Sequence, residues 1–372
     1  MAVVRIPCAA VDLSSDPVVA GGIFDERRWW RVSHCMHPPK PCAGKKVLRL
    51  PAVAVVMSVY PTSVGHFVPE QWPKVLLLHR HLPPSVPILV ADSPPVRRYM
   101  APLISAGVLP PDRVLFHKLS SDGTVVHADH VYTVLSSHFS NVMSGDIAMM
   151  QARAVLDELS PPPVAADGRS HILLIDRSSA RTRRVSNTPG VITTLRRAAV
   201  EVGAIVGAPV DSLGVRSWSP AGNISADVAA FRRAAMIVAP HGAGLANMIF
   251  ASAGTPVIEI CYDDFGAANT KGMACPAMYA AMAVNLHLPY WVVTGAGAYG
   301  TSMAANLTQL GSAAAQALHV AYGGARHTNG AAASGKAAAA TGTGKAAGAR
   351  EKALPRHWKE LPGCGAITAD DK

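Results

Sequence analysis

Short apolar runs alternate with longer amphipathic segments along most of the chain. In the first half, apolar runs bounded by turn-forming residues predict strands at 47–60, 86–92 and 113–119. Apolar residues at helical spacing predict helices at 69–82, 99–108 and 144–159. This alternation is typical of βαβ units, so we expect parallel strands with helices packed against them.

The same alternation is more regular in the second half. Apolar runs predict strands at 171–176, 204–210, 236–240, 256–261 and 289–293. Helices are predicted at 189–203, at 225–235, directly after 241–244, and near 272–285. The proline-rich stretch at 161–168 reads as a linker between two α/β domains, at 47–160 and 169–322. Residues 1–46 are expected to be irregular, and the Ala/Gly-rich tail at 323–372 is expected to be disordered.

The composition is that of a globular protein, and its one unusual property is a formal net charge of +10. The chain is 49% hydrophobic and 16% charged, which excludes a wholly disordered chain and a coiled coil. The tail carries eight basic and four acidic residues, and no basic stripe interleaved with aromatic residues occurs elsewhere, so no nucleic-acid partner is expected. The N-terminus makes a poor signal peptide and no apolar run could span a bilayer, so membrane association is expected only through an anchor absent from this chain.

The cysteines and histidines do not predict a metal site. None of the six cysteines forms a CxxC motif, although Cys35 and Cys42 are close enough in sequence for a local bridge in an oxidising compartment. The pairs His79/His81 and His127/His130 lack further residues at ligand spacing, and the two aspartates at 263–264 do not form a DxD motif. We therefore expect no metal ligands and no requirement for a divalent metal.

The sharpest local signal is a strand, a glycine-rich turn and a helix at 236–250. His241, Gly242, Ala243 and Gly244 form the turn, where free N–H groups at the positive end of a helix suit a phosphate. Asn247 lies one turn into the helix. The turn lacks both GxGxxG and the P-loop Lys-Ser/Thr, so neither of those nucleotide sites is indicated. A tight turn without function is the alternative.

A second group follows the strand at 171–176. Arg177, Arg181 and Arg184 belong to a run of four arginines within eight residues, and guanidinium groups pair with phosphate oxygens. A solvated basic loop is the alternative. Glu259, expected at the end of its strand, suits either ribose hydroxyls or a nearby arginine.

In the first half, His66 and Glu70 lie between a strand and a helix. Either side chain could take a proton from a hydroxyl group, as a general base does. A histidine in such a stretch is more often structural, and the sequence does not decide between the two residues.

Three blocks together resemble the glycosyltransferases of family 61. The string PHGAGLANMIFASAGTPVIEI (240–260) is similar to the family's signature. GHFVPEQWPK (65–74) resembles its N-terminal block, and ILLIDRSSARTRRVSN (172–187) its arginine block. The blocks occur in the family's order over about residues 50–295, most of the predicted folded chain.

This resemblance implies an inverting transferase of GT-B type, with two Rossmann-like domains facing a cleft. A UDP-sugar of the xylose, arabinose or N-acetylglucosamine class would be the donor substrate, without a tightly bound cofactor. The acceptor would be a hydroxyl of a polysaccharide or glycoprotein in the Golgi or endoplasmic reticulum lumen. An inactive relative that binds nucleotide or glycan is the alternative.

Residue by residue, the resemblance also assigns a site. Arg177, with Arg181 or Arg184, would hold the diphosphate together with the 241–244 turn. Glu259 would contact the ribose, and His66 and Glu70 would lie on the acceptor side of the cleft.

Overall fold

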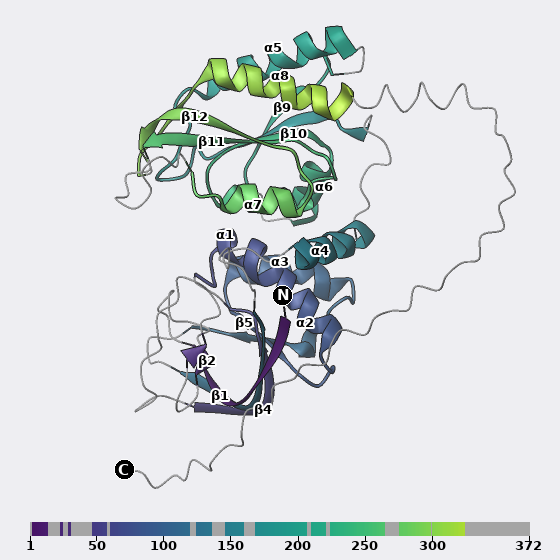
Figure 1. Ribbon diagram of the computed structural model, residues 1–372, viewed down its shortest axis with the longest axis vertical. Coiled ribbons are helices and arrows are strands. Elements are labelled where there is room, and N and C mark those ends of the chain that lie inside the picture. The colour runs from purple at the N-terminus through teal and green to yellow at the C-terminus, as the bar shows by residue number, and fades with distance from the viewer. Residues whose placement is uncertain are drawn as a thin grey trace, which may run out of the picture.

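The computed structural model shows two α/β domains stacked on each other, each built around one sheet (Figure 1). The structure describes residues 2–13, 23–24, 29–30, 47–57, 60–119, 124–135, 146–159, 168–206, 210–220, 224–264, 275–298 and 300–323. The Cys35–Cys42 pair lies outside these residues, as do the expected linker and tail except for their residues 168 and 323. Within the described ranges, no helix combines the length and apolarity needed to cross a bilayer.

The first domain contains a seven-stranded mixed sheet in the order β3-β2-β1-β7-β4-β5-β6. The strands β4 (Val47–Val55), β5 (Ile88–Ala91), β6 (Val114–His117) and β7 (Val125–Leu135) are parallel to their neighbours among these four. The helical elements are α1 (Val64–His66), the π-helical turn η1 (Phe67–Gln71), α2 (Trp72–His81), α3 (Pro94–Ser105), the 3-10 turn η2 (Pro111–Arg113) and α4 (Asp146–Leu159).

The N-terminal segment is not wholly irregular, which corrects the prediction for residues 1–46. The strand β1 (Ala2–Asp12) pairs antiparallel with β7 along its length, and the short strands β2 (Ile23–Phe24) and β3 (Trp29–Trp30) extend the sheet. Pro7 signals a break, and Cys8 has a positive φ of 45° and is skipped in the pairing. Proline is rare inside strands, and the skipped residue breaks the alternation by which a strand is recognised in a sequence.

The second domain contains a six-stranded sheet in the order β13-β12-β11-β10-β8-β9. The strands β8 (His171–Ile175), β9 (Gly214–Trp218), β10 (Ala234–Pro240), β11 (Val257–Asp264) and β12 (Tyr290–Ala298) are parallel, and β13 (Ala304–Ala305) is antiparallel. After β8 the chain adds β9 on one side and then β10 on the other. The crevice at the carboxyl ends of β8 and β10 is therefore the topological switch point, where open α/β sheets bind ligands.

Helices cover both faces of this second sheet. Figure 1 shows α5 (Thr188–Val206) and α8 (Leu307–Gly323) on the outer face. On the face toward the first domain lie α6 (Ile224–Arg232), α7 (Met278–Asn285) and the 3-10 helix η4 (Ala243–Phe250).

The predicted strand at 204–210 is wrong, because α5 continues to Val206. Val202 and Val206 are buried one helical turn apart, so the apolar run belongs to the helix face. The strand that follows is β9, an edge strand with three of its five residues exposed. Such a strand carries little apolar signal.

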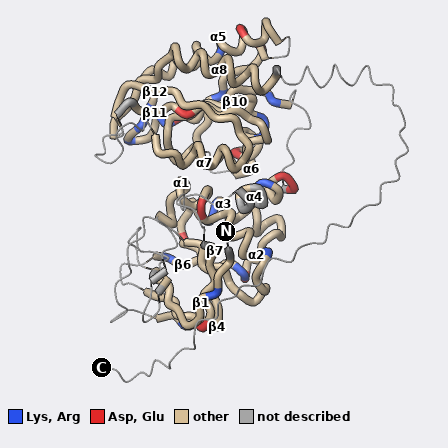
Figure 2. Tube along the Cα trace, in the orientation of Figure 1, with Lys and Arg blue, Asp and Glu red and all other residues tan. Residues whose placement is uncertain are grey.

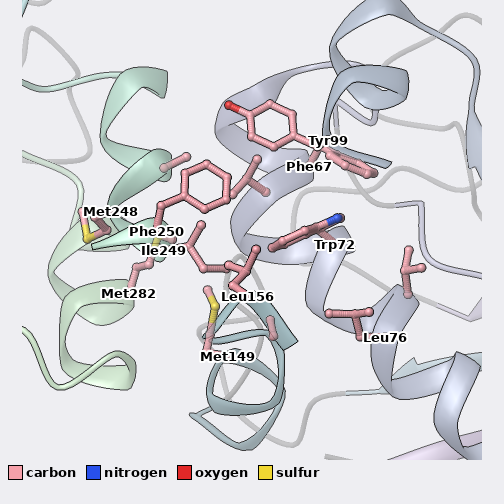
Figure 3. Close-up of a cluster of buried hydrophobic side chains, with 14 of the residues drawn as sticks. Phe67, Trp72, Leu76, Tyr99, Met149, Leu156, Met248, Ile249, Phe250 and Met282 are labelled. Atoms are coloured by element: carbon pink, nitrogen blue, oxygen red, sulfur yellow. The ribbon is translucent and has the colours of Figure 1, made fainter. Parts of the chain in front are cut away.

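The two domains share one apolar core. Phe67, Trp72 and Tyr99 of the first domain pack around Phe250 of η4, and α4 closes the cluster with Met149 (Figure 3). The rings of Tyr99 and Phe250 are stacked at 6.1 Å between centroids, and Trp72 meets Phe250 edge-on at 6.2 Å. Burial of these rings stabilises the stacked arrangement of the domains.

We expect Phe250→Ala to lower the free energy of unfolding by about 3–5 kcal/mol, because it opens a cavity between the domains. Denaturant unfolding measures this. Val200→Ala is the matched control, since Val200 is 56% exposed on α5, and it should change stability by no more than about 0.5 kcal/mol. Equal effects of the two variants would contradict a shared core.

Candidate active site

The switch point of the second sheet brings two of the sequence motifs together. Arg177 follows the end of β8, and the turn 241–244 follows the end of β10, which pairs directly with β8. Gly242 has φ of 153°, and a Cβ there would clash with the guanidinium of Arg177. The turn therefore needs glycine at this position so that Arg177 can lie against it.

A pocket of ≈ 450 Å³ opens at this point and is lined by both domains. Its walls include Arg177, Ala243 and Asn247 from the second domain, with Arg98 and Tyr99 from the first. This volume lies within the range of about 300–1,000 Å³ typical of small-molecule sites.

Polar contacts between the domains hold the walls of this pocket. The hydroxyl of Tyr99 donates to Oδ1 of Asn247 at 2.6 Å, and burial raises the pKa of Tyr99 to about 12. Arg98 forms an ion pair with the buried carboxylate of Asp227, which also accepts from the indole N–H of Trp218 at 2.9 Å. Asn247 is thus a fixed part of the wall rather than a free side chain.

Behind the turn, His241 and Glu259 form a buried pair. Nδ1 of His241 lies 2.6 Å from Oε1 of Glu259, and both side chains are at most 5% exposed. The hydroxyl of Tyr290 donates to Oε2 of Glu259 at 2.7 Å. Burial and the charge of Glu259 raise the pKa of Tyr290, so this phenol stays a hydrogen-bond donor.

Glu259 does not end its strand, contrary to the sequence-based expectation. It is the third residue of β11, which continues to Asp264. Both carboxylate oxygens accept hydrogen bonds from protein side chains. Its contact with a ribose stays a prediction.

His66 and Glu70 form a second, differently exposed pair. Nδ1 of His66 lies 2.6 Å from Oε1 of Glu70; the side chain of His66 is 24% exposed and that of Glu70 is fully buried. They lie four residues apart where α1 passes into the π-helical turn, a distortion common at functional sites. Lys74 is buried near Glu70; burial lowers its pKa and the charge of Glu70 opposes that shift.

Gly65 places this second pair beside the turn of the other domain. A Cβ on Gly65 would lie 3.3 Å from the Cβ of Ala243 and 3.4 Å from the hydroxyl of Tyr279. The backbone of α1 is thus in contact with the turn. His66 and Glu70, proposed from the sequence for the acceptor side, therefore lie across the domain boundary from the 241–244 turn, proposed for the donor side.

The arginine loop is arranged differently from the expectation. Arg181 and Arg184 are exposed, whereas Arg177 and Arg183 are partly buried. The charges of Arg183 and Arg177 both act to lower the pKa of Tyr279, against burial and Glu259, which raise it. Arg183 therefore lies within electrostatic range of the same tyrosine as Arg177, although only Arg177 of the two lines the pocket and the sequence favoured the neighbours of Arg183.

The backbone explains how Arg183 turns inward. It has a left-handed φ of 61°, and its N–H donates to the carbonyl of Thr301 at 2.7 Å. The N–H of Met303 donates to the carbonyl of Arg184 at 2.8 Å, so the loop is fixed on both sides of the turn. No signal in a run of four arginines distinguishes the one with this conformation.

We expect Arg183→Gly to be more stable than Arg183→Ala by about 1 kcal/mol, because only glycine adopts a left-handed φ without a steric cost. Both variants lack the guanidinium, so the difference isolates the backbone. At Arg184, whose φ is not positive, alanine should be the more stable replacement. Thermal unfolding of the four variants checks the order, and the same order at both positions would contradict it.

Comparison with known proteins agrees with this geometry. The model of the family described as Glycosyltransferase 61 matches residues 64–258, more than half of the chain. The match runs from α1, ahead of His66, through Arg177 and the 241–244 turn. A search of curated proteins found no match to the chain. Two stacked α/β domains with mostly parallel strands agree with a GT-B-like fold. The chain belongs to the glycosyltransferase 61 family and is a glycosyltransferase, which takes a sugar donor and an acceptor.

Proposed function

We propose that the protein transfers a sugar with inversion from a UDP-sugar to a hydroxyl of a polysaccharide or glycoprotein. One observation carries the proposal: a turn suited to phosphate, flanked by arginines, is in contact with the element that bears His66, a partly exposed histidine paired with a buried glutamate. An inverting transfer needs these two parts, a stabilised leaving group and one base.

On the donor side, Arg177 and the turn 241–244 bind the diphosphate in the interdomain pocket. At the start of η4 the N–H of Leu245 donates to the carbonyl of Gly242 at 2.9 Å, and the N–H groups ahead of it lie at the helix N-terminus, an end that favours an anion. We add Arg183 to the proposed site, because its charge acts on the same Tyr279 as that of Arg177. Two guanidinium groups and the helix end supply enough positive charge that this site requires no metal. Arg181 and Arg184 remain candidates for a more exposed part of the donor.

On the acceptor side, His66 is the base and Glu70 positions it. Glu70 is fully buried and cannot reach an acceptor, whereas His66 is partly exposed. Its bond to Glu70 holds the proton on Nδ1 and leaves Nε2 free to accept. Nε2 takes the acceptor proton, the acceptor oxygen bonds to the anomeric carbon, and the bond from that carbon to the diphosphate oxygen breaks. The diphosphate leaves with the electron pair.

The donor sugar belongs, in this proposal, to the xylose, arabinose or N-acetylglucosamine class. The reaction takes place in the Golgi or endoplasmic reticulum lumen. The disulfide between Cys261 and Cys275 supports an oxidising compartment.

Incubation with a panel of UDP-sugars and glycan acceptors should reveal hydrolysis or transfer for at least one donor. Arg177→Ala and Arg183→Ala should each lower kcat/KM by about 100-fold, since each removes a positive charge that stabilises the leaving diphosphate. Arg197→Ala on the outer face of α5, where the side chain is 67% exposed, should leave the rate unchanged. Nucleotide binding without turnover by the wild-type protein would favour an inactive relative.

His66→Ala should lower kcat by about 10²–10⁴-fold while leaving the affinity for the UDP-sugar unchanged, because the base acts on the acceptor. Glu70→Gln should retain more activity than His66→Ala, since the amide oxygen of glutamine can still accept a hydrogen bond from the Nδ1–H of His66. Separate measurement of kcat and of nucleotide affinity distinguishes the two effects. If Glu70→Gln were inactive and His66→Ala active, the base would be Glu70.

A further inference from the structure

A disulfide lies directly beside the buried His241–Glu259 pair. Cys261 follows Glu259 by two residues on β11, so both side chains leave the same face of the sheet. Its partner Cys275 lies three residues before α7, the helix that packs Tyr279 against His241 with 5.3 Å between the ring centroids. The disulfide thus fastens the start of α7 next to the pair.

The sulfur of Cys275 lies close to two other side chains of the kinds that bind metal ions. A ring nitrogen of His241, a carboxylate oxygen of Glu259 and Sγ of Cys275 all lie within 4.8 Å of one another. Ligands of a tetrahedral zinc ion are separated by about 3.5 Å. Zinc would therefore open the 2.6 Å hydrogen bond between His241 and Glu259, and small side-chain rotations would bring the sulfur of Cys275 closer to both. While Cys275 is bonded to Cys261, its sulfur is not available as a thiolate.

We propose that reduction of the Cys261–Cys275 disulfide creates a site for Zn²⁺ formed by His241, Glu259 and Cys275. Two equivalents of a thiol reductant convert the disulfide to two thiols and become a disulfide themselves. Zinc then displaces the proton of the Cys275 thiol to solvent. His241 binds as a neutral imidazole through the ring nitrogen that faces Glu259, with its one proton on the other ring nitrogen. The inference does not rest on the transferase reaction.

Charge and hydrogen bonding support zinc at this place. One thiolate and one carboxylate neutralise the two charges of the ion, which a buried site requires because Arg177 and Arg183 act on the same region. The hydroxyl of Tyr290 already holds the second oxygen of Glu259, as groups around zinc ligands commonly do. Imidazole, carboxylate and thiolate are the three ligand types that zinc takes in proteins.

The disulfide and the metal therefore exclude each other. In the oxidised protein Cys275 is covalently bonded, and in the reduced protein it is free to hold zinc against the turn. Bound zinc would fix His241, whose backbone opens the turn 241–244.

The test is titration of the full chain with Zn²⁺ alone against a chromophoric zinc indicator, with and without a phosphine reductant. The reduced wild-type protein should bind one equivalent more than the oxidised protein. Reduced Cys275→Ser should lack this equivalent. Cys261→Ser should bind it without any reductant, because its Cys275 thiol has lost its partner.

Cys261→Ser and Cys275→Ser are matched controls for each other. Both lack the disulfide, both retain Cys8, Cys35, Cys42 and Cys364, and each keeps one of the two thiols, so stronger zinc binding by Cys261→Ser identifies the Cys275 thiol as the ligand. In the Cys261→Ser background, Glu259→Gln and Tyr290→Phe should each weaken zinc binding by at least about tenfold. Equal zinc binding by Cys261→Ser and Cys275→Ser would overturn the proposal.

Discussion

The burial of η4 between the two domains is the constraint on which the site depends. Residues Leu245–Phe250 of this 3-10 helix are all buried, and its last ring, Phe250, lies in the shared apolar core. Its first residues belong to the turn against which Arg177 packs. The anion-binding end of the helix is therefore positioned by hydrophobic packing at its other end. The ion pair between Arg98 and Asp227 adds a polar contact between the domains, and Figure 2 shows the charged residues dispersed over both described domains.

Two His–Glu pairs with the same 2.6 Å bond have different environments. His66 keeps part of its ring exposed, whereas His241 is enclosed by Glu259, Tyr279 and the turn. The two histidines differ in exposure and not in the length of the hydrogen bond to glutamate. His66 can therefore reach an acceptor substrate, whereas His241 can only support the backbone around it. The pair at 241–259 is best understood as the support of the turn that precedes η4.

The sequence was sufficient for the fold class and the family, because both depend on patterns that the chain carries locally. Alternating apolar runs predicted the α/β architecture, and the three motif blocks predicted the family; both predictions are confirmed. The strand β1 was missed because Pro7 and the positive φ of Cys8 interrupt its pattern. Arg183 and the Cys261–Cys275 disulfide were missed for another reason. A loop conformation and a Cα separation of 5.5 Å are tertiary facts that sequence spacing does not contain.

The bond between Tyr99 and Asn247 joins residues 148 positions apart in the chain. The pocket wall that it holds therefore forms only when the second domain docks on the first. During synthesis the first domain emerges earlier and presents Phe67, Trp72 and Tyr99 without their cover. Until the second domain docks, these aromatic side chains lack that cover, and exposed apolar surface of this kind favours aggregation. The interdomain contact that organises the site is therefore also a surface that the chain must protect before the domains meet.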